Sequence, residues 1–547
     1  MKLSILSNIN VDSLINKISM EYEVYQTEGY GVWLQEITNP NSGLYAFRPE
    51  TVFIIVDGEE IFKGLGVETG LEKTIKYIKE AADSNPEITF FISDIDIWQE
   101  EIRSAKSPSV GEEYERLWGE GLHRLSEQCK NVYIFGLKAI IQIIGREQFY
   151  SRKLWYLGGI KFTMKAERLL EQQIKRYINS LRGIKKKCLI LDLDNTLWGG
   201  IVGEDGLEGI ELSDYKEGAR YKDFPKRLKE IKGLGVILAV VSKNNYEDAI
   251  KVFREHDHMV LAENDFVGLK INWDLKSNNI RALSEELNIG LDSFVFIDDN
   301  PVERESVKRE LPQVAVPDFP EDTSMLSDFA LEVYNSYFYT LDVTDEDIAK
   351  TKIYRENVKR KNAQRTSASY EEFLKSLDTK IKIKKIEPGD IRRVTQLVQK
   401  TNQFNLTTKR YSEQELLEMI GQNNIMGFAA YVSDKFGDNG LVCVAILRCK
   451  SDDVAELDTF LLSCRVMGRF IEDQIISYIE SFCKGKGYKK LIGHYIPTKR
   501  NAPAKGLFDR LGYSLTDGGS ESGEEYALDL GKSDSPPRKK FGEMVII

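Results

Sequence analysis

Short apolar runs alternate with amphipathic segments along the first 182 residues. The runs TVFIIVDG, ITFFISDID and NVYIFGLKAII have the length of buried strands, whereas LEKTIKYIKEAA and EYERLWGEGLHRLSEQ carry apolar residues at helical spacing. Strands that alternate with helices indicate a mostly parallel sheet covered by helices. We therefore predict that residues 1–182 form an α/β domain.

A second series of the same kind follows the basic stretch RGIKKK. Its apolar runs CLILDLDNT, VILAVVSKNN and SFVFIDDNP are separated by helical patterns such as YEDAIKVFREH and NNIRALSEELNI. This alternation predicts a second α/β domain over residues 183–340, with a Rossmann-like parallel sheet.

Helical patterns prevail from Thr344 to Leu377, where Ser369 and Glu372 have the spacing of a capping box. The runs MGFAAYVSD, LVCVAILRC and AELDTFLLSC then alternate with further helices. We expect residues 341–515 to form a helical linker and an α+β domain. Residues 516–547 are rich in Gly, Ser and charge, so we expect a loose segment there.

Composition narrows the class of protein. A net charge of −11 argues against a general affinity for nucleic acid or for an anionic membrane. The six cysteines form no C-x-x-C pair and no zinc-ligand spacing, which is typical of a reduced, cytoplasmic setting. The N-terminus lacks a signal-peptide pattern, and no run reaches the roughly 20 apolar residues of a spanning helix. We expect a cytoplasmic protein with no nucleic-acid partner and no membrane partner.

The run LILDLDNTLWGG ends in two carboxylates one residue apart. Asp192 and Asp194 follow a predicted buried strand, and open α/β sheets bind ligands at the carboxyl ends of their strands. Alternation along an extended chain places both side chains on the same side. Two unpaired carboxylates there would repel each other, and a hard divalent cation such as Mg²⁺ removes the conflict.

Other chemistry-bearing residues stand at later strand ends and at one helix start. They are Ser242 in VVSKNN, Lys276 in INWDLKSNNI, and Asp298 with Asp299 in VFIDDNP. A carboxylate nucleophile, a metal, a hydroxyl and a lysine together suit phosphoryl transfer through an aspartyl phosphate. Lys270 is an alternative to Lys276; we prefer Lys276 because it opens the helix before the last motif.

The order D-x-D-x-T, strand-ending Ser, Lys and then D-D resembles the haloacid-dehalogenase-like phosphotransferase superfamily. The resemblance implies Asp192 as nucleophile and Asp194 as acid and base on the leaving group. It also implies that Thr196, Ser242 and Lys276 hold phosphate oxygens. Mg²⁺ would be bound by Asp192, by Asp298 with the support of Asp299, and by the backbone carbonyl of Asp194.

The spacing of these motifs leaves no room for a large cap domain. Between Asp194 and Ser242 the chain fits one glycine-rich flap, GGIVGEDGLEGIEL, and one helix. Two interpretations stay open at this point. An open site would admit a phosphate on a large partner or carrier, or a neighbouring domain would serve as the lid.

The third region has a second recognisable pattern in SCRVMGRFIEDQIISYIESF. A strand passes through a glycine turn into a long helix, whose first N–H groups suit phosphate binding. With NAPAKGLFDRLGYSL downstream, it resembles the GNAT-like acetyltransferase fold, whose coenzyme A loop reads Gln/Arg-x-x-Gly-x-Gly/Ala. Arg465 and Gly468 match that loop, beside Arg469, but Phe470 replaces the last small residue and puts coenzyme A in doubt. A phosphopantetheine arm has the same thiol end, and a noncatalytic packing domain is the alternative.

The combination resembles the FkbH-like family over nearly the whole chain. LDLDNTLWGGIVGEDG, KSNNI, FIDDNPVERE, TNQFNLTTKRY and SCRVMGR carry the resemblance. Family members load a glyceryl unit from 1,3-bisphosphoglycerate onto an acyl carrier protein and release phosphate, and others serve surface-polysaccharide pathways. The resemblance implies a Mg²⁺-dependent phosphatase and acyltransferase whose partners are a small phosphorylated substrate and a phosphopantetheine carrier.

Two further classes of function remain. One is a phosphatase of a sugar or small acid with a purely structural GNAT-like domain. The other is a carrier-binding assembly factor without turnover, against which the intact motif residues weigh.

Cys464 ends the strand TFLLSC beside Arg465, where a cation and a helix start favour a thiolate. We hypothesise that Cys464 accepts the acyl group before the carrier thiol; a buried, inert cysteine is the alternative. His494 is a weaker candidate base, since a core histidine is the usual case. TNQFNLTTKRY has polar side chains that could bind a hydroxylated acid, and an ordinary polar loop is the alternative interpretation. These residues are Asn402, Gln403, Asn405, Thr407 and Arg410.

The first domain resembles the SGNH-hydrolase fold that FkbH-like proteins carry. Ser7 follows its first strand, where a nucleophile would stand. The sequence LSNINVD lacks the usual Gly-Asp-Ser, and no Asp-x-x-His ends the region to supply a base. We interpret this domain as a noncatalytic scaffold or docking module.

Overall fold

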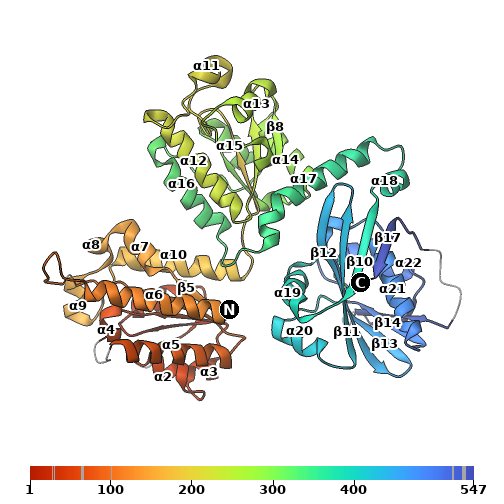
Figure 1. Ribbon diagram of the computed structural model, residues 1–547, viewed down its shortest axis with the longest axis horizontal. Coiled ribbons are helices and arrows are strands. Elements are labelled where there is room, and N and C mark those ends of the chain that lie inside the picture. Colours follow the sequence, from red (N-terminus) through yellow and green to blue (C-terminus); the bar gives the residue numbers. More distant parts are fainter. Residues whose placement is uncertain are drawn as a thin grey trace. The chain divides into compact units, whose positions relative to one another are not determined.

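The computed structural model describes residues 1–546 except 28, 30, 63–66, 100, 520–522 and 532–537 (Figure 1). The chain divides into two compact units, Met1–Lys185 with Glu332–Asp342, and Lys186–Leu331 with Val343–Ile547. The second unit contains two separate sheets. We therefore describe a first domain (the first unit), a second domain (Lys186–Leu331) and a third domain (Val343–Ile547).

The first domain is built on a five-stranded parallel sheet in the order β2-β1-β3-β4-β5. Its apolar runs are continuous because the central strands are buried on both faces. The strands are β1 (Lys2–Ser7), β2 (Glu23–Tyr25), β3 (Thr51–Ile55), β4 (Thr89–Ser93) and β5 (Val132–Phe135). The helices are α1 (Asp12–Ile18), α2 (Trp33–Thr38), α3 (Gly43–Phe47), α4 (Gly58–Phe62), α5 (Val67–Ser84), α6 (Val110–Gln128), α7 (Leu137–Ile144), α8 (Arg146–Phe149), α9 (Arg152–Gly158) and α10 (Met164–Leu181).

The second domain has a four-stranded parallel sheet in the order β8-β7-β6-β9. Every residue of β6, β7 and β9 is buried, which explains their uninterrupted apolar runs. The strands are β6 (Cys188–Leu191), β7 (Ile237–Ser242), β8 (Phe266–Ile271) and β9 (Phe294–Ile297). The helices are α11 (Val202–Gly209), α12 (Lys216–Gly233), α13 (Tyr246–Glu255), α14 (Lys276–Leu287), α15 (Pro301–Glu310) and α16 (Leu326–Val333). The fold is the expected Rossmann-like one, and its connections hold only short elements, with no large cap.

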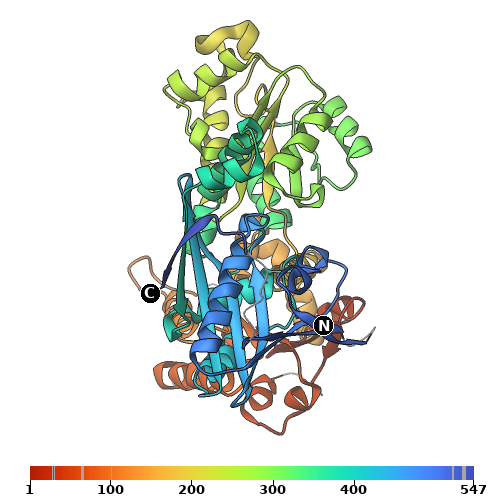
Figure 2. The same ribbon diagram turned by 90° about the vertical axis from the view of Figure 1, so that its right-hand side faces the viewer.

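The third domain is a mixed eight-stranded sheet in the order β15-β16-β14-β13-β12-β11-β10-β17. Apolar residues of α21 pack on one face of the sheet and those of α19 and α20 on the other (Figure 1). Figure 2 looks onto the face that α21 covers. The strands are β10 (Thr379–Lys385), β11 (Ile425–Asp434), β12 (Gly437–Ser451), β13 (Val454–Leu462), β14 (Lys490–Tyr495), β15 (Ser514–Gly519), β16 (Gly523–Asp529) and β17 (Gly542–Ile546). The helices are α17 (Asp345–Thr366), α18 (Tyr370–Ser376), α19 (Ile391–Lys400), α20 (Glu413–Ile420), α21 (Ile471–Gly485) and α22 (Leu507–Arg510).

The helical linker begins and ends largely as its sequence indicates. Thr344 caps α17 in a reciprocal capping box with Asp347. Ser369 caps α18 by accepting a hydrogen bond from the N–H of Glu372, as its position suggests. The long helix α17 contacts β7, β8 and α14 of the second domain and β12 of the third.

Two expected boundaries are wrong. Residues 332–342 belong with the first domain, because Tyr339 stacks on Tyr177 of α10 with ring centroids 5.3 Å apart. The end of the chain is not loose where it is described, since β16 pairs with β14 and β15, and β17 pairs with β10. Charged and glycine-rich composition concealed these strands. Among the described residues, no helix is long and apolar enough to cross a membrane.

Candidate active site

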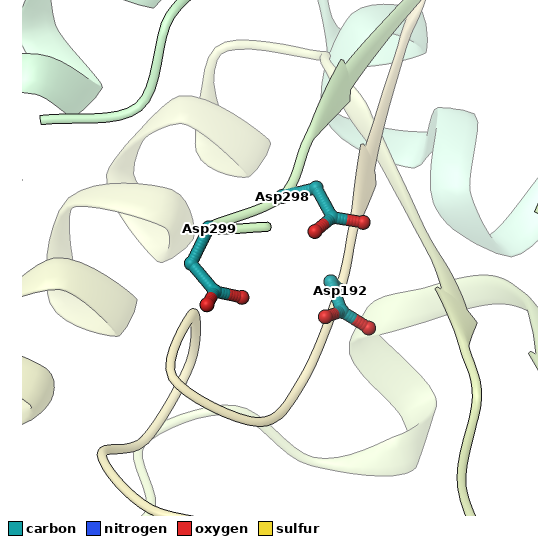
Figure 3. A group of neighbouring side chains, drawn as sticks. All are labelled: Asp192, Asp298 and Asp299. Carbon is teal, nitrogen blue, oxygen red and sulfur yellow. The ribbon is translucent and has the colours of Figure 1, made fainter. Parts of the chain in front are cut away.

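Three carboxylates meet at the carboxyl end of the second domain's sheet. Asp192 follows β6, and Asp298 and Asp299 follow β9, which pairs with β6 in parallel. The backbone N–H of Asp192 continues this pairing by donating to the carbonyl of Ile297 at 3.0 Å. One oxygen from each carboxylate lies within 4.8 Å of the other two (Figure 3). Strand register thus brings together residues more than a hundred positions apart.

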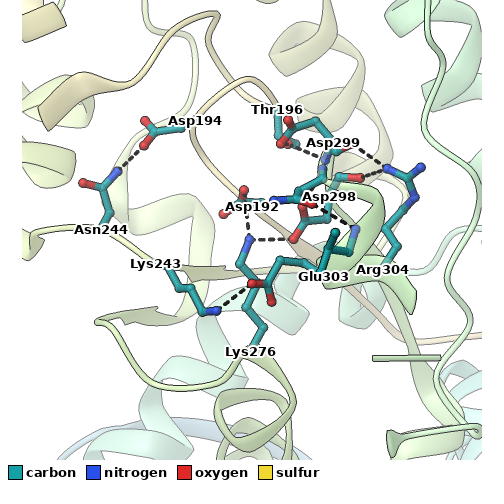
Figure 4. A network of polar contacts seen from close by, with 12 residues as sticks. Asp192, Asp194, Thr196, Lys243, Asn244, Lys276, Asp298, Asp299, Glu303 and Arg304 are labelled. Atoms are coloured by element: carbon teal, nitrogen blue, oxygen red, sulfur yellow. Dashed lines mark hydrogen bonds and ion pairs between the residues drawn. The ribbon is translucent and has the colours of Figure 1, made fainter. Parts of the chain in front are cut away.

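Lys276 supplies the positive charge of this group. It is the first residue of α14, is 4% exposed, and its Nζ lies 3.0 Å from Asp192 Oδ2 and 2.6 Å from Asp298 Oδ2 (Figure 4). Burial lowers the pKa of Lys276, but the two carboxylates outweigh it and raise the pKa overall. Lys270 instead lies on β8 and pairs with Glu286. Of the two candidate lysines, the structure brings Lys276 to the carboxylates.

One ammonium does not balance three buried or half-buried carboxylates. Burial and the nearby Asp192 raise the pKa of Asp298 to about 7, although Lys276 opposes them. The pKa of Asp299 is raised for the same two reasons. Asp192 Oδ1 is buried and has no hydrogen-bond partner among the described residues. An orphaned carboxylate oxygen beside two other carboxylates is a set of donors that fits a hard divalent cation.

Thr196 and Ser242 lie beside the group but differ in what surrounds them. Thr196 is fully buried, and its Oγ1 accepts from the N–H of Asp299 at 3.2 Å and lies 3.3 Å from Asp299 Oδ1. Its hydroxyl therefore orients Asp299 in this state of the chain. Ser242 ends β7, next to β6 in the sheet, and is also buried.

Asp194 lies apart from the three carboxylates and is held by three donors. Its Oδ1 accepts from Trp198 Nε1 at 2.8 Å and from the N–H of Val202 at 3.1 Å, and its Oδ2 accepts from Asn244 Nδ2 at 2.8 Å (Figure 4). Burial raises the pKa of Asp194, and the hydrogen bonds from Val202 and Trp198, which lower it, only partly offset this rise. The side chain is thus tied to the start of α11, and only the backbone of Asp194 remains a candidate metal ligand.

Sequence reasoning missed several residues that shape the site. Asn244 and Trp198 hold Asp194, and the guanidinium of Arg304 donates to the carbonyls of Asp298 and Asp299 at 2.9 and 2.6 Å. Their motifs, LWGG, SKNN and NPVERE, are visible in the sequence. Their contacts are not, because Asn244 reaches Asp194 from another loop, and the local contacts of Trp198 and Arg304 depend on how their own segments turn.

The candidate acyl site of the third domain is less open than its sequence suggests. Cys464 is exposed directly after β13, so the alternative of a buried, inert cysteine is wrong. Arg465 donates through Nε to Ser463 Oγ at 3.0 Å. Arg469 is 9% exposed, and its guanidinium donates to Asp434 at 2.8 Å and to the carbonyl of Arg465 at 3.0 Å. Two donors of Arg469 are therefore used by contacts that hold the fold.

The segment TNQFNLTTKRY also serves the fold. Asn405 is fully buried, donates to the carbonyl of Thr401 and accepts from the N–H of Thr408. Leu406 donates to the carbonyl of Phe460 on β13 and accepts from the N–H of Ile496 beyond β14. The segment thus fills the gap that opens where β13 and β14 stop pairing. Asn405 as an acyl-binding residue stays a prediction, although both the nitrogen and the oxygen of its amide are already engaged within the chain.

Other polar side chains of the same region are also engaged. Asn402 Oδ1 accepts from Arg410, and Thr407 Oγ1 donates to the carbonyl of Asp458. His494 is partly exposed, with Nε2 3.3 Å from Glu456 Oε1, and so is not a core histidine. These contacts leave Cys464 as the most accessible reactive group of the set.

Among the residues of the first domain that the structure describes, no nucleophile–base pair stands at the sheet edge. Ser7 ends β1, and its Oγ accepts from the N–H of Ile9 at 3.2 Å. The one histidine in the first 185 residues, His123, is exposed on α6. At this edge a fully buried Lys161 pairs with Asp57 and Glu59. The role of this domain as a noncatalytic scaffold stays a prediction.

Comparison with known proteins gives similarity at the level of domains. No family model matches the chain, and no curated protein matches it. A crystal structure of the N-terminal part of a Bacteroides fragilis protein, containing a phosphatase domain complexed with Mg, is similar at 28% identity and a TM-score of 0.57. The match covers 62% of this chain and 94% of that one.

Acetyltransferase structures also match, over a smaller part. The GNAT domain of a Streptomyces lividans protein matches at 14% identity and a TM-score of 0.23, covering 27% of this chain and 89% of that one. An N-acetyltransferase from Thermoplasma acidophilum in complex with coenzyme A matches at 17% identity and a TM-score of 0.22, covering 27% and 98%.

Proposed function

We propose that this chain is a Mg²⁺-dependent phosphatase that uses Asp192 as its nucleophile and also transfers an acyl group to a carrier thiol. The observation that carries the proposal is the state of Asp192. One of its oxygens lies 3.0 Å from Lys276, and the other is buried without a partner beside Asp298 and Asp299. The similarity to a phosphatase domain complexed with Mg supports the same assignment.

Asp192, Asp298 and Asp299 would hold the ion, together with the backbone carbonyl of Asp194. When bound, Mg²⁺ offsets the negative charge of the phosphoryl group and of the carboxylates around it. Lys276 adds a fixed ammonium that reaches Asp192 and would face a phosphoryl oxygen on the same side. Ser242, at the end of the neighbouring strand, would donate to a second oxygen.

In the proposed reaction an Asp192 oxygen attacks phosphorus, and the bond from phosphorus to the leaving oxygen breaks. Asp194 donates a proton to that oxygen, which leaves as an alcohol. Asp194 then takes a proton from the water that attacks the aspartyl phosphate, which releases inorganic phosphate and restores Asp192. For these proton transfers, Asp194 must break at least one of its hydrogen bonds to Trp198 and Asn244.

The substrate we propose is an acyl phosphate that also carries a phosphate ester, of which 1,3-bisphosphoglycerate is an example. Attack by Asp192 on the acyl phosphate would discard the activated carboxyl group, so the phosphate ester is its proper target. The exposed thiol of Cys464 would lose its proton, attack the acyl carbon, form a thioester and expel phosphate. The carrier thiolate would then attack that thioester, take the acyl group and restore Cys464.

A plain phosphatase with a structural third domain is the second candidate. The burial of Asn405 and Arg469 favours it, because two residues expected to bind the acyl arm are used by the fold. In that case the phosphatase site would act alone on a phosphorylated small molecule.

Intact-mass spectrometry separates the candidates. The chain is incubated with Mg²⁺, 1,3-bisphosphoglycerate and a phosphopantetheinylated carrier, and phosphate release is measured in parallel. A glyceryl mass on the carrier that disappears with Cys464→Ala supports acyl transfer. Phosphate release without any mass gain leaves the plain phosphatase, and unchanged phosphate release from Asp192→Asn refutes the assignment of the nucleophile.

A further inference from the structure

The loop before α21 is where the resemblance to acetyltransferases implies that coenzyme A binds. We infer that this chain does not bind coenzyme A there, because its own residues occupy the positions that the pyrophosphate needs. The inference goes beyond the proposed function, since it excludes a class of acyl donor and acceptor that the fold would otherwise suggest. Three independent sets of contacts around Gly468–Asp473 support it.

Two polar groups of the loop, the carbonyl of Gly468 and the guanidinium of Arg469, are already bound within the chain. The carbonyl of Gly468 accepts from the hydroxyl of Tyr370 on α18 at 2.8 Å. Arg469 reaches back to Asp434, which is fully buried and also accepts two hydrogen bonds from Arg360 of α17. A pyrophosphate therefore meets no free arginine at position 469. Freeing it would strip one of two cations from a buried carboxylate.

Aromatic and cationic side chains surround Phe470, the residue directly before α21. Phe470 stands where the acetyltransferase loop has a small residue, and it adopts a left-handed backbone conformation with φ +57°. Its ring lies 5.9 Å from that of Phe541, just before β17, and Lys539 Nζ lies 4.7 Å from its centroid. The guanidinium of Arg510 faces the same ring at 5.6 Å. The C-terminal segment thus lies against the place that a small residue would leave open.

The start of α21 also carries its own negative charges. Glu472 and Asp473 lie in the first turn and are 5% and 3% exposed. Arg510 donates to both of them, at 3.1 Å to Glu472 and at 2.5 Å to Asp473. The N-terminal end of a helix attracts anions through its unpaired N–H groups and dipole. Here two buried carboxylates already stand at the helix start, and a pyrophosphate would be placed beside their negative charge.

The chemical consequence concerns which thiol compound can exchange an acyl group with the third domain. A thiol that lacks the adenosine diphosphate part of coenzyme A, such as a phosphopantetheine arm, needs no pyrophosphate contact at this helix. The exposed Cys464 lies outside the covered turn and stays accessible to such a thiol. The third domain would therefore exchange acyl groups without coenzyme A.

Calorimetric titration of the full chain with coenzyme A tests the inference, under reducing conditions so that Cys464 forms no mixed disulfide. Hydrogen exchange of the amides of residues 466–474 is followed on the same sample. We expect no saturable heat up to about 1 mM coenzyme A, and a change in exchange of less than about twofold. A cooperative unfolding transition shows that the sample is folded, so the result does not depend on phosphatase activity.

Saturable binding together with slowing of these amides by about tenfold or more would overturn the inference. Saturable binding without such slowing supports it, because the ligand would then occupy another part of the chain. Failure of phosphate release in a separate assay would refute the proposed phosphatase and leave this inference untouched.

Discussion

Replacing Lys276 by Met removes the ammonium that lies against Asp192 and Asp298. The ammonium is 4% exposed and lies 3.0 Å from one carboxylate and 2.6 Å from the other. Without it, the carboxylates of Asp192, Asp298 and Asp299 remain together at the sheet edge. We expect the Lys276→Met variant to be less stable and less active than the unaltered chain.

The size of the effect follows from the geometry. A pair of unit charges 3 Å apart is worth about 5 kcal/mol at an effective dielectric constant of 20. Burial of the ammonium offsets part of this gain, so the net loss on removing one partner of a buried pair is about 3–5 kcal/mol. Loss of a fixed charge facing the phosphoryl oxygens should also slow phosphate release by about 10²–10³-fold. Mg²⁺ should narrow the gap in stability, because it restores positive charge between the carboxylates.

Lys270→Met is the matched control. Lys270 pairs with Glu286 at a half-exposed site, where such a pair contributes about 0–1 kcal/mol. Hydrogen exchange of the β6 and β9 amides in rising urea reports the second domain separately from the rest of the chain. Equal stability of the two variants, or a loss of phosphate release in Lys270→Met alone, would refute the reasoning.

Three further variants test other parts of the structure. Burial raises the pKa of Asp94 to about 6, so the folded first domain keeps a proton that the unfolded chain loses near pH 4, and its stability falls as pH rises from about 4 to 6. Asp94→Asn should therefore raise the free energy of unfolding at pH 7 by roughly 1–2 kcal/mol, seen as a higher melting temperature, with no gain at pH 4. Equal gains at pH 4 and pH 7 would contradict the raised pKa of Asp94. Asn244→Ala frees one oxygen of Asp194 and should cut phosphate release by about 10–100-fold, while urea denaturation shows a loss of only about 1 kcal/mol; unchanged kinetics would exclude a positioning role. Arg360→Met leaves the buried Asp434 with one cation in place of two. We expect urea denaturation to show that the third domain loses about 2–4 kcal/mol of stability. A loss below about 1 kcal/mol would contradict a stabilising role of the Arg360–Asp434 pair.

The candidate site of the second domain was largely predictable from the sequence. Asp192, Ser242 and Asp298 stand at the ends of apolar runs, and parallel strands bring such ends to one edge. The choice between Lys270 and Lys276 could only be argued from a helix start. The structure places Lys276 beside the carboxylates because α14 begins there, whereas β8 directs Lys270 to Glu286.

The third domain shows where motif reasoning has its limit. Arg469 and Asn405 have the residue types and spacing expected of a binding loop. Both are buried. The side chain of Arg469 is bound by Asp434, 35 positions away, whereas that of Asn405 is bound by the backbone of Thr401 and Thr408. The sequence does not show whether a polar side chain is available to a ligand or already hydrogen-bonded within the fold.

The sequence by itself determined the three α/β and α+β domains, because apolar periodicity reflects which faces of strands and helices are buried. It also determined the residues at the strand ends of the second domain, since parallel pairing follows from the alternation of strands and helices. Only the tertiary structure decided how Asp194 is held, which lysine meets Asp192, and what covers the start of α21. Most of these contacts join segments that are distant in sequence, as Asn244 and Lys276 show. The contacts of Asp194 with Trp198 and Val202 are local, but they depend on how the loop folds, which no pattern of apolar and polar residues encodes.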